Sequence, residues 1–446
     1  MKSLFFTISA IALLSAVQIA PAMSRYSNMP GDLILSGNLN QTCIPHRGGT
    51  VFLQMQLDAR NFPTPEQCAR PMNLAVVLDR SGSMADEHKI VYAKQSIDAL
   101  IDRLTSNDYL SITIYDDRVE TLLPTQRVTD RGRIKRLVDG IYPRGSTNLG
   151  GGMQEGFRQI ERNFKEEYVN RVILLSDGLA NQGITDPRKL SSIASEYRNR
   201  GISLSTIGVG LDYNENLMLG LAEGGGGNYY FVESPSQLAS IFEKELNGLA
   251  YIVVQNARIE LALGRGVSVN DVIGCEHRRE GNRWIIPVGD ISATEHREFT
   301  VELNIPEGSG TLNAVSGTLR YDGKNSIRSR GFSAGIRYSD ITAELEKSKD
   351  LDTQGKVDIA VSTRQVEKAM EAIDEGRGED AQKQVGEALL MLESSVSMNS
   401  AVAAPAVQSQ ILQLKEYSDT LKDGSNMARA KKSIQYKNYR TQKKKE

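Results

Sequence analysis

Five oxygen-bearing side chains recur where apolar stretches of this sequence end, and together they could hold a metal ion. Asp79, Ser81 and Ser83 alternate in VVLDRSGSMAD, Thr147 lies in the glycine-rich loop PRGSTNLGGG, and Asp177 follows an apolar stretch in LLSDGLANQG. Hard cations such as Mg²⁺ and Mn²⁺ prefer oxygen ligands. The pattern predicts a divalent-cation site, with Mg²⁺ first and Mn²⁺ or Ca²⁺ as alternatives. The simpler interpretation is that the first three residues only cap a turn.

The elements around these residues predict the sheet that would bring them together. From residue 71 to 249, apolar stretches such as MNLAVVLD and RVILLSD alternate with helical patterns in which residues such as Ile90, Ala93 and Ile97 share one face. Strands that alternate with helices imply a mostly parallel sheet covered by helices on both faces. In such doubly wound α/β folds, ligands bind beyond the carboxyl ends of the strands, where the five residues are expected.

Residues 71–249 contain a DRSGS motif, Thr147 and an SDG motif, and with these features they resemble a von Willebrand factor A (vWA) domain. The vWA domain has a Rossmann-like fold. The three features match the metal-ion-dependent adhesion site of that family in order, spacing and strand context. The resemblance implies that Ser81, Ser83 and Thr147 bind the ion directly. Asp79 and Asp177 would act through water and orient the hydroxyl groups. A Glu or Asp of a protein partner would then complete the coordination shell.

The flanking regions predict two further parts. Residues 31–70 and 250–337 contain stretches such as TVFLQMQLDA and REFTVELNIP, whose period-two alternation predicts one antiparallel β-sandwich interrupted by the α/β domain. This arrangement resembles exported bacterial proteins that carry an inserted A domain. Residues 340–424 predict a helical region that begins with a helical hairpin.

The first residues indicate a signal peptide over residues 1–22. Lys2 is followed by an uncharged stretch up to Met23, and Ala20 and Ala22 fit a cleavage site. We therefore predict an exported protein, periplasmic or secreted after cleavage. The alternative is an uncleaved membrane anchor, for which the stretch is long enough.

The cysteines and the last residues give two weaker predictions. Cys43 and Cys68 flank one predicted strand and can form a disulfide in an oxidising compartment, whereas the alternative keeps all three cysteines, including Cys275, reduced. Residues 425–446 carry a run of Lys and Arg residues with Glu446 as the one acid after Asp423. Such a run predicts a disordered, solvated tail. The alternative is a contact with an anionic envelope surface.

Several function classes are disfavoured by the sequence. A net charge of −2 gives no reason to expect nucleic acid, and the four histidines lack metal-ligand spacing to one another. Neither a nucleophile elbow with a histidine context nor a phosphate-binding P-loop is present, so we predict that the protein is not an enzyme. We predict a cation-dependent protein-binding module for adhesion or envelope assembly, with Arg80 pointing outward. The alternative is a structural or channel-regulating envelope subunit that uses the A domain as a scaffold.

Overall fold

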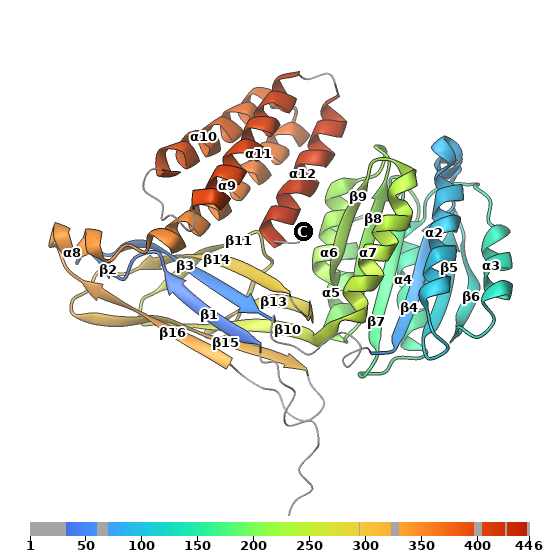
Figure 1. Cartoon of the computed structure of the whole chain (residues 1–446), viewed down its shortest axis with the longest axis horizontal. Coiled ribbons are helices and arrows are strands. Elements are labelled where there is room, and N and C mark those ends of the chain that lie inside the picture. The colour runs from blue at the N-terminus through green and yellow to red at the C-terminus, as the bar shows by residue number, and fades with distance from the viewer. Residues whose placement is uncertain are drawn as a thin grey trace, which may run out of the picture.

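The chain folds into three parts, an α/β domain, a β-sandwich and a helical bundle (Figure 1). The computed structural model describes residues 33–59, 70–293, 295–322, 330–396, 404–423 and 426–443. The predicted fold class is confirmed, because a doubly wound, mostly parallel sheet is inserted in a sandwich that is antiparallel except for the short pairing of β2 (Cys43–Ile44) with β16 (Arg330–Tyr338), and is followed by a helical region. The predicted signal peptide, residues 1–22, and Cys68 of the predicted disulfide lie outside the described residues.

The sheet of the α/β domain is built on apolar strands that are buried on both faces. Its order is β6-β5-β4-β7-β8-β9, and every neighbouring pair is parallel except β5 and β6. These strands are β4 (Met72–Asp79), β5 (Tyr109–Tyr115), β6 (Val119–Arg127), β7 (Val169–Ser176), β8 (Ser203–Val209) and β9 (Gly226–Val232). Strands β5 and β6 are added on one side of β4, and β7, β8 and β9 follow on the other side. The switch point of this sheet therefore lies between β4 and β7.

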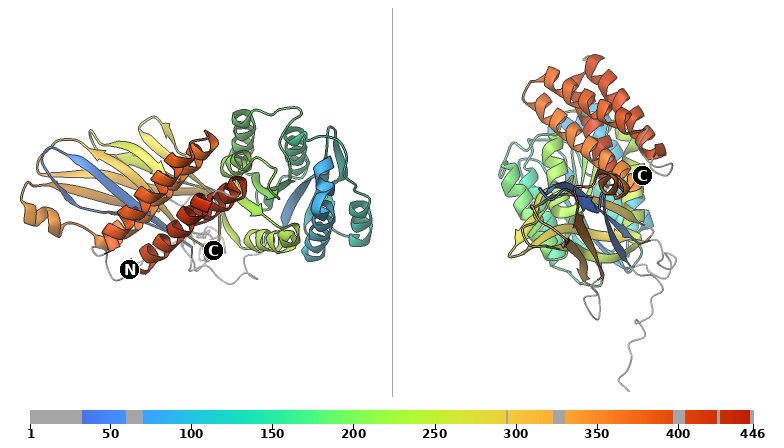
Figure 2. Two further views of the ribbon diagram at one scale, coloured as in Figure 1. Left: turned by 90° about the horizontal axis from the view of Figure 1, so that it is seen from above. Right: turned by 90° about the vertical axis from the view of Figure 1, so that its left-hand side faces the viewer.

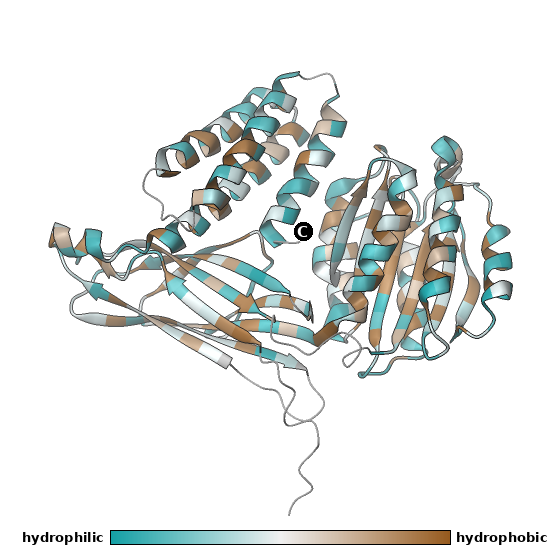
Figure 3. Cartoon of the chain, in the orientation of Figure 1, coloured by the Kyte–Doolittle hydropathy of each residue, from teal (hydrophilic) through white to brown (hydrophobic). Residues whose placement is uncertain are grey.

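Helices cover both faces of this sheet, because alternate residues of each strand point to opposite sides. Leu74, Val76 and Leu78 of β4 belong to one core, whereas Ala75 and Val77 belong to another. The first core includes α2 (Lys89–Arg103), α3 (Arg131–Asp139) and α7 (Leu238–Ala250), which follows the short η2 (Pro235–Gln237). The second includes α4 (Leu149–Glu161), α5 (Pro187–Asn199) and α6 (Glu215–Gly225). Figure 3 shows the apolar colouring concentrated on these strands.

The sandwich joins segments from both sides of the α/β domain. One sheet has the order β1-β3-β14-β11, and in it Leu53 of β3 faces Val301 of β14. Residues before and after the inserted domain therefore share one core. The strands of this sheet are β1 (Ile34–Leu39), β3 (Gly49–Asp58), β14 (His296–Ile305) and β11 (Ser268–Ile273). The second sheet, in the order β12-β13-β10-β15-β16-β2, consists of β12 (Arg278–Glu280), β13 (Arg283–Ser292), β10 (Ile252–Leu263), β15 (Thr311–Asp322), β16 (Arg330–Tyr338) and β2 (Cys43–Ile44).

The C-terminal helices form a bundle over the sandwich, as the two views of Figure 2 show. Asp350 begins the first long helix by accepting hydrogen bonds from the backbone N–H groups of Asp352 and Thr353, which is an N-cap. The bundle consists of α9 (Leu351–Asp374), α10 (Gly378–Val396), α11 (Ala404–Asp423) and α12 (Met427–Lys443), whereas the short α8 (Thr342–Lys347) lies at the end of the sandwich beside β2 (Figure 1). Within the described part of the chain, no helix combines the length and the apolar character needed to cross a membrane.

The prediction of a disordered basic tail over residues 425–446 is wrong for Met427–Lys443, which forms α12. This helix is the member of the bundle that lies next to the α/β domain (Figure 1). Its buried Lys432 donates to the Tyr213 carbonyl oxygen at 2.7 Å and pairs with Glu215, while Lys431 also pairs with Glu215 at 2.7 Å. The positive charges are thus neutralised within the chain, and these lysines are not available to an anionic surface.

Two helix-interior glycines predict opposite responses to alanine. A Cβ at Gly156 of α4 would lie 2.4 Å from Val77 Cγ2, whereas a Cβ at Gly386 of α10 would meet nothing within 4 Å. We expect Gly156→Ala to destabilise by about 1–3 kcal/mol through overpacking. Gly386→Ala should stabilise by about 0.4–1 kcal/mol, because it reduces the freedom of the unfolded chain. Amide hydrogen exchange in α4 and in α10 measures the two stability changes separately. Equal protection of α4 in the wild type and in Gly156→Ala would contradict the predicted destabilisation.

Candidate metal centre

The five predicted site residues all lie at the carboxyl edge of the parallel sheet. Asp79 is the last residue of β4, Asp177 directly follows β7, and Ser81 and Ser83 lie at the start of the short helix η1 (Gly82–His88). Thr147 belongs to the loop before α4. Because β4 and β7 are parallel neighbours, their carboxyl ends and the loops that follow them meet at one place.

Hydrogen bonds join four of these side chains directly or through the backbone. The Ser83 hydroxyl donates to Asp177 Oδ1 at 2.9 Å, and the Ser81 and Ser83 Oγ atoms are 3.2 Å apart. Asp79 accepts from the Ser81 N–H at 2.8 Å and from the Ser176 hydroxyl at 2.7 Å. Both carboxylates are fully buried. The bonds to Asp79 fix its orientation, and the two serine hydroxyls lie side by side.

Thr147 is held in the same place by backbone contacts between loops. Its N–H donates to Asn181 Oδ1 at 2.9 Å, which ties its loop to the one after β7. The Gly82 N–H donates to the Gly145 carbonyl oxygen at 3.1 Å, and this bond connects the Thr147 loop to the loop after β4. A Cβ built at Gly178 would lie 3.3 Å from Thr147 Oγ1 and 3.8 Å from Ser83 Oγ. The two hydroxyls therefore border a common space, and glycine at position 178 leaves it open.

Lys89 is a member of the site that the sequence did not reveal. Its ammonium group donates to Asp177 Oδ2 at 2.9 Å and lies 4.0 Å from Asp212 Oδ2, and its side chain is only 3% exposed. In the sequence it is one lysine at the start of an amphipathic helix, a position that normally faces solvent. Only the position of Asp177 in the folded structure explains why Lys89 is buried.

The prediction that Arg80 points outward is wrong. Its side chain is buried and donates to Asp116 Oδ2 at 2.8 Å, and Arg144 donates to the same oxygen, also at 2.8 Å. Asp116 is fully buried at the end of β5, so an unpaired charge there would be costly. The two guanidinium groups hold the pKa of Asp116 below its usual range, although burial acts in the opposite direction.

The three buried carboxylates at this edge differ in their partners, and this difference bears on a metal ion. Asp116 has two guanidinium partners and Asp177 has an ammonium partner, whereas the described donors to Asp79 are both neutral. Burial accordingly raises the pKa of Asp79 to about 6. A nearby divalent cation would favour its charged form. The residues present fit such an ion.

The donors at this site are mainly hydroxyl groups. Among the described residues, no group of three or more His, Cys, Asp or Glu side chains is arranged to hold a metal. An ion here would therefore depend on Ser81, Ser83 and Thr147 together with two carboxylates. Hard cations accept such oxygen ligands, with water completing the shell.

Comparison with known proteins places this domain in a known family. The sequence profile of the von Willebrand factor type A domain matches residues 73–244. The Escherichia coli "Uncharacterized protein YfbK" is 28% identical over 57% of this chain and 45% of its own length, so the chain spans less than half of that relative. Another relative, named "E3 ubiquitin-protein ligase WAV3" from Arabidopsis thaliana, is 28% identical over 55% of this chain and 32% of its own. The absence of enzymatic activity therefore stays a prediction.

The complete three-part fold recurs in solved structures. The "von Willebrand factor type A from Catenulispora acidiphila" has a TM-score of 0.74 at 15% identity and covers 94% of this chain and 98% of its own. The "ArnB paralog VWA2 from Sulfolobus acidocaldarius" has a TM-score of 0.60 at 20% identity, with coverage of 92% and 98%. At these identities the likeness concerns the fold alone. Together with the profile match, it means that this chain contains a von Willebrand factor type A domain, set between the strands of a β-sandwich.

Proposed function

We propose that this protein is a divalent-cation-dependent protein-binding module for adhesion or envelope assembly. Ser81, Ser83 and Thr147 would hold the ion, and Asp79 and Asp177 would orient them. The observation that carries the proposal is the shared space between Ser83 Oγ and Thr147 Oγ1 beside Gly178, at the switch point of the sheet. vWA domains typically mediate protein–protein interaction, which supports the same conclusion.

The charges around the site favour an acidic partner. Asp79 and Asp177 carry two negative charges, and the Lys89 ammonium on Asp177 removes one of them. A bound Mg²⁺ would leave the cluster with one net positive charge, in surroundings where Coulomb interactions are poorly screened. A Glu or Asp side chain from another protein supplies both the missing charge and an oxygen ligand. The ion itself supplies the Lewis acidity for that contact when bound.

Mg²⁺ is our first candidate for the ion, because hydroxyl and carboxylate oxygens with bound water suit it. We also propose that the protein is exported, on the basis of the signal-like residues 1–22. The scaffold alternative, in which the sandwich and bundle capture partners and the vWA domain only supports them, is tested by the same variants.

Removal of one hydroxyl should weaken metal binding. We expect Ser83→Ala to reduce Mg²⁺ affinity at least about 10-fold. Even the loss of a residue that only hydrogen-bonds to a metal ligand lowers metal affinity about 10- to 100-fold. Isothermal titration calorimetry with Mg²⁺ and Mn²⁺ measures this effect. Ser106→Ala is the matched control, because Ser106 is an exposed serine just before β5, at the opposite edge of the sheet.

The partner itself requires a capture experiment with the same variants. Immobilised protein is exposed to envelope extract in Mg²⁺ or in EDTA, and the captured proteins are identified by mass spectrometry. Capture that needs Mg²⁺, survives Ser106→Ala and is lost in Ser83→Ala and Asp79→Ala supports the proposal. Capture that is unchanged in EDTA and in Asp79→Ala would reject it in favour of the scaffold alternative.

The buried Lys89–Asp177 pair predicts a large loss of stability when only its cation is removed. Lys89→Met leaves the Asp177 carboxylate buried without its ammonium partner, and breaking such a pair costs about 3–5 kcal/mol. Lys135→Met is the control, because Lys135 pairs with Asp102 at 2.7 Å on the surface, where an ion pair contributes about 1 kcal/mol or less. Chemical denaturation monitored by circular dichroism compares them. Similar losses in both variants would show that Asp177 does not depend on Lys89.

A further inference from the structure

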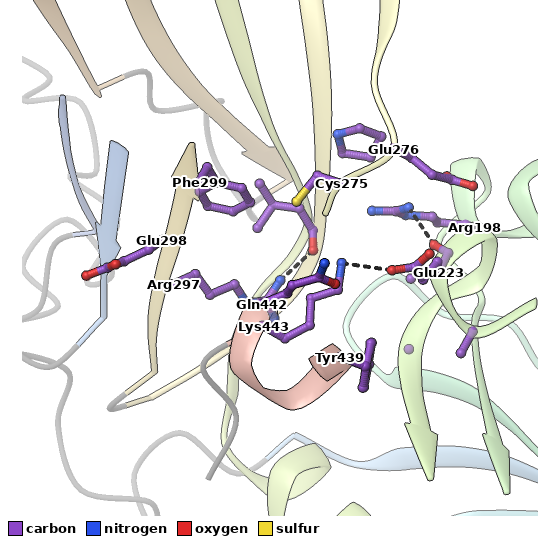
Figure 4. Close-up of a pocket in the computed structure, with 15 residues that line it drawn as sticks. Arg198, Glu223, Cys275, Glu276, Arg297, Glu298, Phe299, Tyr439, Gln442 and Lys443 are labelled. Atoms are coloured by element: carbon purple, nitrogen blue, oxygen red, sulfur yellow. Dashed lines mark hydrogen bonds and ion pairs between the residues drawn. The ribbon is translucent and has the colours of Figure 1, made fainter. Parts of the chain in front are cut away.

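A cavity of about 60 Å³ lies where the vWA domain, the sandwich and α12 meet, away from the candidate metal centre. Figure 4 shows Arg198 entering it from the vWA domain, Cys275 and Phe299 from the sandwich, and Tyr439 and Lys443 from α12. All three parts of the fold therefore contribute to its walls. A ligand in this space would touch each of them.

Arg198 is the unusual member of this cavity. Arg198 is only 8% exposed. Its one described hydrogen bond is donated by Nη1 to the Glu223 carbonyl oxygen, at 3.1 Å. It forms no ion pair within 4.0 Å with any carboxylate of the described residues. A guanidinium group has five N–H donors, so four of them have no acceptor among the described residues. Burial also lowers the pKa of Arg198, as expected for a buried cation without a close counter-ion.

The other cations of the cavity already have partners. Lys443 pairs with Glu223 at 3.1 Å and donates to the Gly274 carbonyl oxygen at 3.2 Å. Arg297 pairs with Glu295 at 2.7 Å. Two acids attract Arg198 at longer range. Asp290 accepts from Arg171 at 3.0 Å, and Glu276 lines the cavity, where burial and the nearby Glu223 raise its pKa and so favour its neutral form. An anion that binds beside Arg198 would thus not have to displace an existing ion pair.

Tyr439 of α12 adds a second donor to the lining of the cavity. Its hydroxyl oxygen accepts from the Tyr229 N–H at 3.3 Å and donates to no described residue, so its proton is available to a ligand. Two glycines leave room around the guanidinium. A Cβ at Gly226 would lie 2.7 Å from Arg198 Nε, and a Cβ at Gly289 would lie 3.4 Å from Arg198 Nη2. The backbone therefore packs directly on the guanidinium group, and a side chain at either position would crowd it.

We propose that this cavity binds a small oxyanion, a phosphate or a carboxylate group, through Arg198 and Tyr439. Planar guanidinium groups bind two oxygens of such anions at once, and these charge-assisted bonds are stronger than neutral ones. The volume of about 60 Å³ is enough for one such group. The bound anion links α5 of the vWA domain to α12 and the sandwich. The site is independent of the metal centre and of its partner.

The test is isothermal titration of the full chain with sodium phosphate, sodium acetate and sodium chloride at equal ionic strength. EDTA is present so that phosphate cannot bind through a metal ion at Ser83. We expect saturable binding of phosphate, acetate or both, and none of chloride. Arg198→Gln should weaken binding about 10- to 100-fold, as for loss of a charged hydrogen bond, and Tyr439→Phe about 2- to 10-fold.

Arg188→Gln is the matched control, because it removes the same charge from an exposed position of α5. It should bind like the wild type. Tyr439→Phe keeps the aromatic ring and so remains informative if Arg198→Gln does not fold. Preference for phosphate or for acetate identifies which oxyanion the site takes. Absence of saturable binding in the wild type, or equal binding in the wild type and in both cavity variants, would overturn the proposal.

Discussion

The candidate metal centre depends on the parallel pairing of β4 with β7. Leu78 of β4 lies opposite Leu175 of β7, which brings the next residues of both strands to the same edge. A shift of one residue would turn every side chain to the other face of the sheet. The hydrogen bond from Ser176 to Asp79, at 2.7 Å, joins the two strand ends and favours the observed register. Apolar packing on both faces and one polar contact therefore select the same alignment.

A second constraint is electrostatic. Three fully buried carboxylates, Asp79, Asp116 and Asp177, lie at the ends of the three neighbouring strands β4, β5 and β7. Isolated buried charges are very costly, so each requires a partner. Asp116 and Asp177 have arginine or lysine partners within the chain, whereas Asp79 has neutral donors. Asp79, the carboxylate without a protein cation, accepts from the N–H of Ser81, and a metal ion held by the neighbouring hydroxyl groups would supply the missing charge.

The sequence predicted the fold and the position of the five candidate residues at one edge of the sheet, because both follow from local patterns. Apolar strands that end in Asp79 and Asp177 can be recognised without their neighbours. Lys89, Arg198 and the residues of α12 could not be found in this way, because each lies at a position that is normally solvated. Their burial depends on partners far along the chain, such as Glu215 for Lys432. Charge runs and helix periodicity carry no information about such partners.

The C-terminal helix also bears on the metal centre, although it does not touch it. Lys432 of α12 binds the Tyr213 carbonyl oxygen and stacks over the Tyr213 ring at 4.4 Å. Tyr213 follows the loop in which Asp212 approaches Lys89, and a Cβ at Gly210 of that loop would lie 3.2 Å from Lys89 Cε. Lys89 in turn holds Asp177. Because each of these groups is packed between its neighbours, α12 supports the loop that encloses Lys89. This basic helix is therefore part of the structural support of the candidate metal centre.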